Sequence, residues 1–482
     1  MTVLIYSYTD WQAALVPQIA TALKTEGQET VHIGRRTKPV SSPTVRGLRG
    51  FAPFEEHGEL PFLQDAQGFE DLYLNDYVEQ MTRYSKGFAR GHHSLERTYE
   101  YRDHFHLTAR KILAYFRREQ VTAALFFNVP HKGDDYLMYR VAESLGLPIV
   151  LLINSLFRAK FFSATKLENI GCLDMADTPD EQEIAFEALD KELRDSVKVY
   201  MGGSYKARDQ RPRLKDYVGP LIIIATRCPR LFLRPKQLKA ALEEVRRIRK
   251  SLGKFRRTRS EIGRGKKAAA YLTWLARLER DLTALPANIV YLAMHYQPEM
   301  TSSPQGGRYM DQALLIEELS AKLPPEMTLV AKENPLQAGY NRSPEFIARV
   351  TRCPNVIMAH PHMDTAALQA KAALVATITG TAGWEAIKAG KPCLTFGYAW
   401  YRSCQGITPF TRDTDLAAAI ASPPTVEGTQ EFLSQLMART HDGVIYEAFL
   451  KDASPEYEVQ NRANLASLCV ELILGRAQTT FG

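Results

Sequence analysis

Four groups of polar residues in the second half of the chain each follow a short apolar run. They lie at residues 295–299 (HYQPE), 332–333 (KE), 360–364 (HPHMD) and 379–383 (TGTAG). The apolar runs predict β-strands, so each group is placed at the carboxyl end of a strand. Open α/β sheets bind their ligands at that edge. One group alone is more simply a capped turn, but four together predict a shared binding site.

The small-residue turn at 379–383 predicts an anion site. The segment is strand (373–378), turn, short helix (384–389) and strand (392–396), which is a βαβ unit. The free N–H groups and positive dipole at a helix N-terminus bind phosphate. Glu385, which we place in the first turn of the helix, can accept hydrogen bonds from ribose hydroxyls. The pattern therefore predicts a site for the phosphate and ribose of a nucleotide sugar.

The residue types at the other strand ends predict complementary roles. Lys332 can neutralise a phosphate, while Glu333 can accept a hydrogen bond from ribose or base. The HPHMD sequence superficially suggests a metal site, but its spacing favours base recognition or a structural turn. No metal or cofactor is therefore predicted. The predicted donor-binding residues are His295, Gln297, Glu299, Lys332, Glu333, His360, Thr379, Gly380, Thr381, Gly383 and Glu385.

A fifth polar group, at residues 128–135 (NVPHKGDD), follows the apolar run 121–127 in the first half of the chain. His131, Asp134 and Asp135 are the catalytic candidates, because each can take a proton from an acceptor hydroxyl. Asp134 fits an N-cap of the following helix equally well. His131 and Asp135 are therefore favoured for chemistry.

Alternating apolar strands and amphipathic helices predict an α/β protein with two Rossmann-like domains that face each other across a cleft. The predicted parts are an acceptor-side domain (1–200), a basic helical linker (201–286) and a nucleotide-sugar domain with terminal helices (287–482). Single elements include a helix over 10–25, irregular chain over 34–70, helices over 72–84 and 94–119, and an acidic helix over 180–198. The end of the chain, 414–474, reads as mostly helical.

Bulk composition excludes several classes. The 482 residues are 45% hydrophobic and 24% charged, with a net charge of +7 and six cysteines. No run approaches the roughly 20 apolar residues of a membrane helix, and residues 1–11 lack signal-peptide features, so a cytoplasmic protein is expected. The cysteines form no CxxC pairs, which disfavours zinc sites and disulfides. The basic stretch within 230–267 predicts either a solvated insertion or a peripheral contact with anionic membrane, not nucleic-acid binding.

Three segments resemble the capsule polysaccharide biosynthesis proteins related to bacterial Kdo transferases, which have a GT-B fold. They are YLAMHYQPEMTSSPQGGRYMDQ (291–312), VAKENP (330–335) and TITGTAGWEAIKAGKPCLTFG (377–397). The resemblance implies metal-independent transfer of a sugar from a CMP- or UDP-linked donor, with CMP-Kdo as a candidate, to a capsular or cell-surface glycan or a lipid-linked acceptor. The family usually has His where this chain has Asn334. If that His contacts the donor phosphate, the donor or its geometry differs here.

Two alternative functions remain open at this point. The segment 377–397 is also similar to the corresponding turn of non-hydrolysing UDP-sugar 2-epimerases, so the first alternative is a sugar-nucleotide 2-epimerase of the same fold. The second alternative is a non-catalytic glycan-binding scaffold protein.

Overall fold

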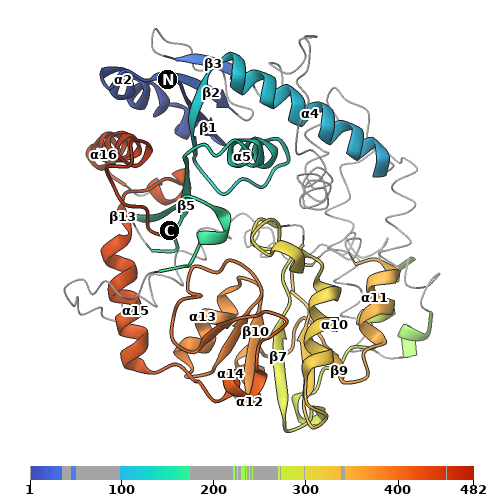
Figure 1. The fold of residues 1–482 in the computed structure, drawn as a ribbon. Helices are drawn as coiled ribbons and strands as arrows, with labels where there is room; N and C mark the ends of the chain where they lie inside the picture. Colours follow the sequence, from blue (N-terminus) through green and yellow to red (C-terminus); the bar gives the residue numbers. More distant parts are fainter. Residues whose placement is uncertain are drawn as a thin grey trace. The chain divides into compact units, whose positions relative to one another are not determined.

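The computed structural model describes residues 2–34, 45–49, 98–173 without 158, scattered positions between 221 and 242, and 270–482 without 272, 298, 338–341 and 452. The chain divides into two compact units (Figure 1). Unit 1 contains Met1–Gly203 and Gln430–Gly482, and unit 2 contains Ser204–Thr429. Within the described residues, no helix is both long and apolar enough to span a bilayer.

Unit 1 is built on a mixed sheet with the strand order β13-β6-β5-β4-β1-β2-β3. Five strands are parallel: β1 (Thr2–Ser7), β2 (Glu29–Gly34), β3 (Arg46–Arg49), β4 (Val121–Phe126) and β5 (Ile149–Asn154). β6 (Lys160–Ala164) and β13 (His441–Asp442) extend the sheet in antiparallel fashion. The chain starts at the centre with β1, runs outward to β3, and then returns to β4 on the other side of β1. The gap between β1 and β4 is therefore the topological switch point of this sheet.

The helices of unit 1 bury the sheet and explain where the chain's last residues pack. They are α1 (Asp10–Ala13), α2 (Val16–Thr25), α4 (Thr98–Arg118), α5 (Asp134–Ser144), α16 (Pro455–Ile473) and the 3-10 turns η2 (Leu167–Asn169) and η7 (Glu447–Leu450). The single helix predicted over 10–25 is two helices, because Pro17 lies in the first turn of α2 and cannot continue a preceding helix.

The C-terminal segment belongs to unit 1, whereas the sequence placed residues 287–482 together. α16 lies beside α2 (Figure 1), and its Leu465 and Cys469 share one buried cluster with Ile19 and Leu23 of α2. β13 pairs with β6, which fixes a second point of the returning chain. Burial of this apolar face against the first sheet is the physical reason for the difference.

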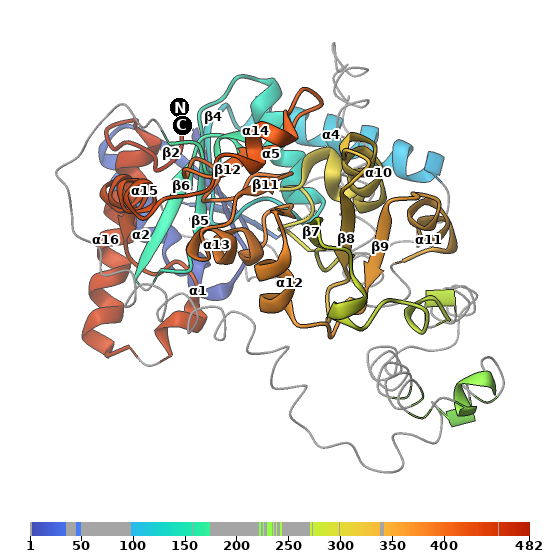
Figure 2. The same ribbon diagram turned by 90° about the horizontal axis from the view of Figure 1, so that it is seen from below.

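Unit 2 is built on a sheet whose strands are all parallel, in the order β12-β11-β10-β7-β8-β9. The strands are β7 (Ile289–Ala293), β8 (Thr328–Lys332), β9 (Val356–Ala359), β10 (Leu374–Thr377), β11 (Cys393–Thr395) and β12 (Ile407–Pro409). Figure 2 shows β7, β8 and β9 side by side. Counted from β7, this is the strand order of a dinucleotide-binding Rossmann sheet, and its switch point lies between β7 and β10.

The remaining elements connect and cover this sheet. They are η3 (Pro229–Leu233), η4 (Leu282–Ala284), η5 (Gly307–Met310), α10 (Gln312–Lys322), α11 (Pro344–Thr351), α12 (Thr365–Lys371), α13 (Thr381–Lys388) and α14 (Leu416–Ile420). The next helix, α15 (Val426–Arg439), crosses the boundary at residues 429–430 and lies mostly in unit 1. One face packs Val290, Leu292 and Leu329 into a cluster with α10, and the other packs Tyr291 and Val330 with α12 and α13.

The predicted α/β class with two Rossmann-like units, as in a GT-B protein, is confirmed by these two sheets. The facing arrangement across a cleft stays a prediction. Residues 34–70 were predicted as irregular, but β3 lies within them. It forms because its backbone pairs in parallel with β2 at the edge of the sheet. The helices predicted over 72–84 and 180–198, and most of the basic linker, fall outside the described residues.

Candidate functional site

The loops after β7 and β10 meet at the switch point of the second sheet. His295 Nε2 accepts a hydrogen bond from the Thr379 N–H at 3.2 Å, and Thr379 Oγ1 donates to the Thr301 carbonyl at 2.7 Å. A Cβ at Gly380 would lie 2.9 Å from Thr377 Oγ1 and 3.0 Å from His295 Cε1, so a larger residue would have to displace these side chains. Two of the four predicted loops are therefore in direct contact.

The helix that follows this turn begins at an N-cap residue that has no side chain to cap it. Gly380 is the N-cap of α13 and donates its own N–H to Thr377 Oγ1 at 3.3 Å, whereas the carboxylates of Asp311 and Asp364 cap α10 and α12. The Tyr401 hydroxyl donates to the Gly380 carbonyl, and its ring leaves no room for a Cβ at Gly383. The arrangement exposes Thr381 at the start of the helix, where N–H groups can bind an anion.

One helical position differs from the prediction. α13 begins at Thr381 rather than at Trp384, because Gly380 already has the extended conformation of an N-cap, with φ −74° and ψ 160°. Glu385 is therefore the fifth residue of the helix and lies in its second turn, not its first. It still acts electrostatically on Lys332 and Tyr291, so its carboxylate stays near the strand ends.

Lys332 ends β8 as a mostly buried ammonium with carboxylates around it. Its side chain is 7% exposed, and burial lowers its pKa, while Glu385, Asp364 and Glu333 oppose that shift. These carboxylates favour the charged form of the lysine. Lys332 lies at the carboxyl edge of the sheet, and its binding to an anion stays a prediction.

The HPHMD sequence after β9 forms a structural turn. Asp364 caps α12 by accepting from the N–H groups of Ala366 at 2.9 Å and Ala367 at 3.2 Å. His360 Nδ1 accepts from the His362 N–H at 3.2 Å. Burial, with the charges of Arg280, His362 and Lys332, lowers the pKa of His360 to about 3, so the ring is neutral at pH 7. Among the described residues, no group of three or more potential metal ligands is close enough to hold a metal ion.

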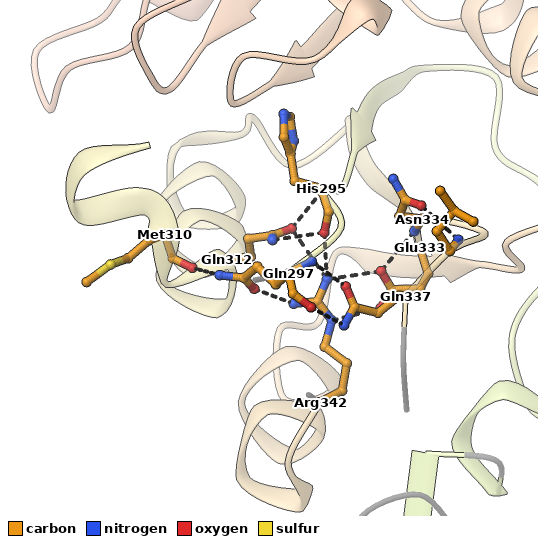
Figure 3. Close-up of polar contacts among 9 residues, drawn as sticks. His295, Gln297, Met310, Gln312, Glu333, Asn334, Gln337 and Arg342 are labelled. Carbon is orange, nitrogen blue, oxygen red and sulfur yellow. Dashed lines mark hydrogen bonds and ion pairs between the residues drawn. The ribbon is translucent and has the colours of Figure 1, made fainter. Parts of the chain in front are cut away.

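Glu333 and Gln297, both predicted to contact the donor, accept hydrogen bonds from Arg342, which was not predicted as a site residue. Arg342 is 1% exposed and Glu333 is fully buried. Arg342 Nε and Nη2 donate to the two carboxylate oxygens of Glu333 at 2.9 and 3.0 Å, and Nη1 donates to Gln297 Oε1 at 2.7 Å (Figure 3). Gln297 Nε2 in turn donates to the Met310 carbonyl. The structure therefore gives both side chains a place inside a polar network.

Glu299 and Asn334 also turn toward their own loops. Thr301 Oγ1 donates to Glu299 Oε2 at 3.1 Å. Asn334 Oδ1 accepts from the Leu336 N–H at 2.8 Å, which closes a tight turn of the Asx type. The position where the family usually has His is thus used here to shape the loop after β8.

His295 is buried in the neutral form, which makes the stability of unit 2 sensitive to acid. Burial lowers its pKa to about 4, against an ordinary value near 6.5. As the pH falls, the unfolded chain binds a proton at His295 before the folded chain does. The contribution of neutral His295 to the free energy of unfolding is therefore present above pH 6.5 and is lost as the pH falls toward 4. Between pH 7 and pH 5 the loss is about 2 kcal/mol. Urea unfolding at both pH values should show a smaller drop for His295→Gln, and equal drops would contradict this.

In unit 1, the predicted catalytic loop lies at the switch point between β1 and β4. The His131 ring stacks on Tyr8 with centroids 5.9 Å apart and planes 14° apart, and Lys132 Nζ lies 5.2 Å from the centroid of the same ring. Tyr6 donates from its hydroxyl to Asp134 Oδ2 at 3.2 Å. His131, Asp134 and Asp135 are all buried, with 6%, 5% and 0% exposed. The three predicted residues are therefore brought together with two tyrosines.

Asp135 organises the backbone of this loop. Its carboxylate accepts from the N–H groups of His131 at 3.0 Å, Lys132 at 2.6 Å and Tyr136 at 2.7 Å. Burial and the Asp135 carboxylate also raise the pKa of the Tyr8 phenol. The N-cap of α5 is Gly133, with φ 92°, so Asp134 does not fill the capping position considered for it. These contacts favour a positioning role for Asp135.

One contact decides the tautomer of His131. Its Nδ1 lies 2.5 Å from the Val129 carbonyl oxygen. A carbonyl oxygen only accepts, so Nδ1 carries the hydrogen, and in the neutral ring the lone pair is then on Nε2. Tyr6 and Tyr8 were not predicted as site residues, although two tyrosines alternate with Ser7 at the end of the first strand.

Residues 301–443 match the family model described as capsule polysaccharide biosynthesis protein. The predicted resemblance to this family is confirmed over that segment. The matched segment contains Lys332, the β10–α13 turn and Glu385. No curated protein gives a significant match to the chain.

Solved structures similar to the chain include three whose titles name a sugar, a nucleotide sugar or a nucleotide. KpsC of Thermosulfurimonas dismutans, a beta Kdo 2,7 transferase, is 9% identical, with 96% of this chain and 99% of that chain covered and a TM-score of 0.33. UDP-GlcNAc 2-epimerase of Methanocaldococcus jannaschii is 10% identical, with 91% and 99% covered and a TM-score of 0.23. Glycosyltransferase VinC in complex with dTDP is 14% identical, with 97% and 100% covered and a TM-score of 0.22. Likeness at this level says nothing about the substrate.

Proposed function

We propose that the protein is a glycosyltransferase that moves a sugar from a nucleotide donor to a capsular or cell-surface glycan, with CMP-Kdo as a candidate donor. One observation carries the proposal. The four polar groups predicted to bind the donor follow four neighbouring parallel strands, β10, β7, β8 and β9, of a sheet with Rossmann order. The match to capsule polysaccharide biosynthesis proteins over 301–443 supports the same function.

On this proposal the donor binds at the carboxyl edge of the unit 2 sheet. The uncapped N-terminus of α13 and the Lys332 ammonium hold the phosphate, and Glu385 accepts from the ribose. These groups stabilise the charge that develops on the leaving phosphate as the glycosidic bond to the nucleotide breaks. No metal or cofactor takes part. His295 and the buried network around Arg342 shape the loops rather than touch the donor.

The acceptor is proposed to bind unit 1, with His131 as the general base. Its Nε2 removes the proton from the acceptor hydroxyl as that oxygen attacks the anomeric carbon. Asp135 and Tyr8 hold the loop and the ring in place, so they are positioning residues. Asp134 is held by Tyr6 and is the second candidate for the proton transfer.

A reaction with purified protein, a panel of nucleotide sugars and a capsular oligosaccharide acceptor tests the function. Chromatography should show acceptor-dependent release of the nucleotide and a lengthened glycan. An isomerised nucleotide sugar formed without acceptor would instead identify a 2-epimerase. Glycan binding with no response to CMP or UDP nucleotides in calorimetry would identify a scaffold protein.

A peripheral contact with anionic membrane is part of the proposal, because residues 230–267 are rich in lysine and arginine. The basic segment 230–267, within the linker proposed at 201–286, lies mostly outside the described residues. Its described 3-10 turn η3 exposes Phe232 by 45% and Leu233 by 83% in a sequence rich in arginine. Cosedimentation with phosphatidylglycerol vesicles is expected at low salt and should weaken as salt rises. Absence of binding at low salt would refute the contact.

A further inference from the structure

We propose that Arg342 is a positioning residue that locks the loops after β7 and β8 into one donor-binding geometry. The inference rests on the proposed function of unit 2 and deepens it. Nothing in the sequence indicated that Gln297 and Glu333 pair with an arginine. The residue lies just before α11, nine positions beyond Glu333, and its side chain points between the two loops (Figure 3).

The contacts of Arg342 join these loops directly. It closes the loop after β8 through two bonds to Glu333, at 2.9 and 3.0 Å. It holds the loop after β7 through Gln297 Oε1 at 2.7 Å and the His295 carbonyl at 3.2 Å. One planar guanidinium thus contacts both loops at once.

Two glutamines complete the lock by binding the backbone on both sides of residue 296. Gln312 accepts from the His295 N–H at 2.9 Å and donates to its carbonyl at 3.1 Å. Gln337 does the same for Gln297, accepting at 2.8 Å and donating at 3.1 Å. Arg342 Nη2 also lies 3.5 Å from Gln312 Oε1. The loop is therefore held through the backbone of His295, while the imidazole of His295 contacts Thr379 before α13.

The two loops are joined by the geometry of the guanidinium group and not by its positive charge alone. The guanidinium is planar and donates from Nε, Nη1 and Nη2 in fixed directions, and it stacks over Phe346 at 4.6 Å. A lysine ammonium keeps the charge opposite Glu333 but cannot reach both carboxylate oxygens, Gln297 and the His295 carbonyl together. Arg342→Lys is therefore expected to loosen the loops while the charge is conserved.

The test compares Arg342→Lys with Arg349→Lys in the full chain. Arg349 is a matched control, because it makes a bidentate pair with Glu317 of α10 and a bond to Asp311, the N-cap of α10, whereas Arg342 binds residues 295, 297 and 333. Hydrogen exchange should be at least tenfold faster in Arg342→Lys at the amides of His295, Gln297 and Asn334. Calorimetry with CMP and with UDP should show at least a tenfold higher Kd for whichever nucleotide the parent protein binds. Arg349→Lys should change neither.

The possible results test the role of Arg342 separately from the proposed binding of a nucleotide sugar to unit 2. Parent-like exchange in Arg342→Lys, or equal loosening in Arg349→Lys, would overturn the inference. If the parent protein binds neither nucleotide, the proposed donor site fails, while the exchange measurement still decides the role of Arg342. Should Arg342→Lys not fold, the double variant Glu333→Gln with Arg342→Gln removes both buried charges. If that variant does not fold either, Arg342 supports the whole unit and the inference is wrong.

Discussion

Replacing Lys332 by alanine is expected to lower the rate of sugar transfer by about a hundredfold or more. The ammonium is nearly buried at the end of β8 and is the cation placed among Glu385 and Asp364 at the proposed phosphate site. In a site of low dielectric, one lost donor to a developing negative charge has an effect of this size. Initial rates at saturating donor, together with nucleotide release, measure it.

Two comparisons make the Lys332 result specific. Lys371→Ala removes a lysine from the last turn of α12 in the same unit and should leave the rate unchanged. Lys332→Arg keeps a cation that stays protonated. Since burial lowers the pKa of Lys332, activity of the parent protein should fall at alkaline pH before an ordinary lysine would titrate, and the arginine variant should not show that fall. A full rate in Lys332→Ala would remove this residue from the site.

Replacing His131 by alanine should lower transfer by about a hundredfold to ten-thousandfold while nucleotide binding is retained. The separation is expected because His131 lies in unit 1 and the proposed donor groups lie in unit 2. Calorimetric titration with CMP or UDP gives the Kd of the nucleotide, and transfer kinetics on the same preparation give the rate.

His106→Ala is the matched control for His131, since it removes a half-buried histidine from α4 in the same unit. It should retain the parent rate. A parental rate in His131→Ala, with a severe loss in Asp134→Asn instead, would transfer the role of the base to Asp134. Equal loss of binding and rate in His131→Ala would mean that the loop only supports the fold.

The strand ends of unit 2 could be predicted because each combines an apolar run with an abrupt change to polar residues. β7, β8, β9 and β10 all end within one or two residues of their predicted ends. The strand order, which brings His295 to Thr379, is not encoded in local pattern, since any parallel order satisfies the same alternation. The contact between His295 and Thr379 therefore became visible only in the structure.

Side-chain pairing across loops could not be predicted for a related reason. Glu333 next to Lys332 has the sequence of a ligand-binding pair, and only the return of the chain to Arg342 shows that its carboxylate is already neutralised. Asp135 likewise reads as a free acid, yet three backbone N–H groups occupy it. The amphipathic pattern of α16 predicts a helix with a buried face but does not specify which sheet covers that face.

The return of the chain to unit 1 after residue 429 has a consequence for engineering. Unit 2 is an insertion, whose two ends join unit 1 at residues 203–204 and 429–430. Truncation after residue 429 would strip α16 from α2 and leave an apolar surface that promotes aggregation, so unit 1 is not obtained by shortening the chain. Exchange of donor specificity between relatives would instead require a cassette cut at both junctions, with the first and last segments of the chain kept from one parent.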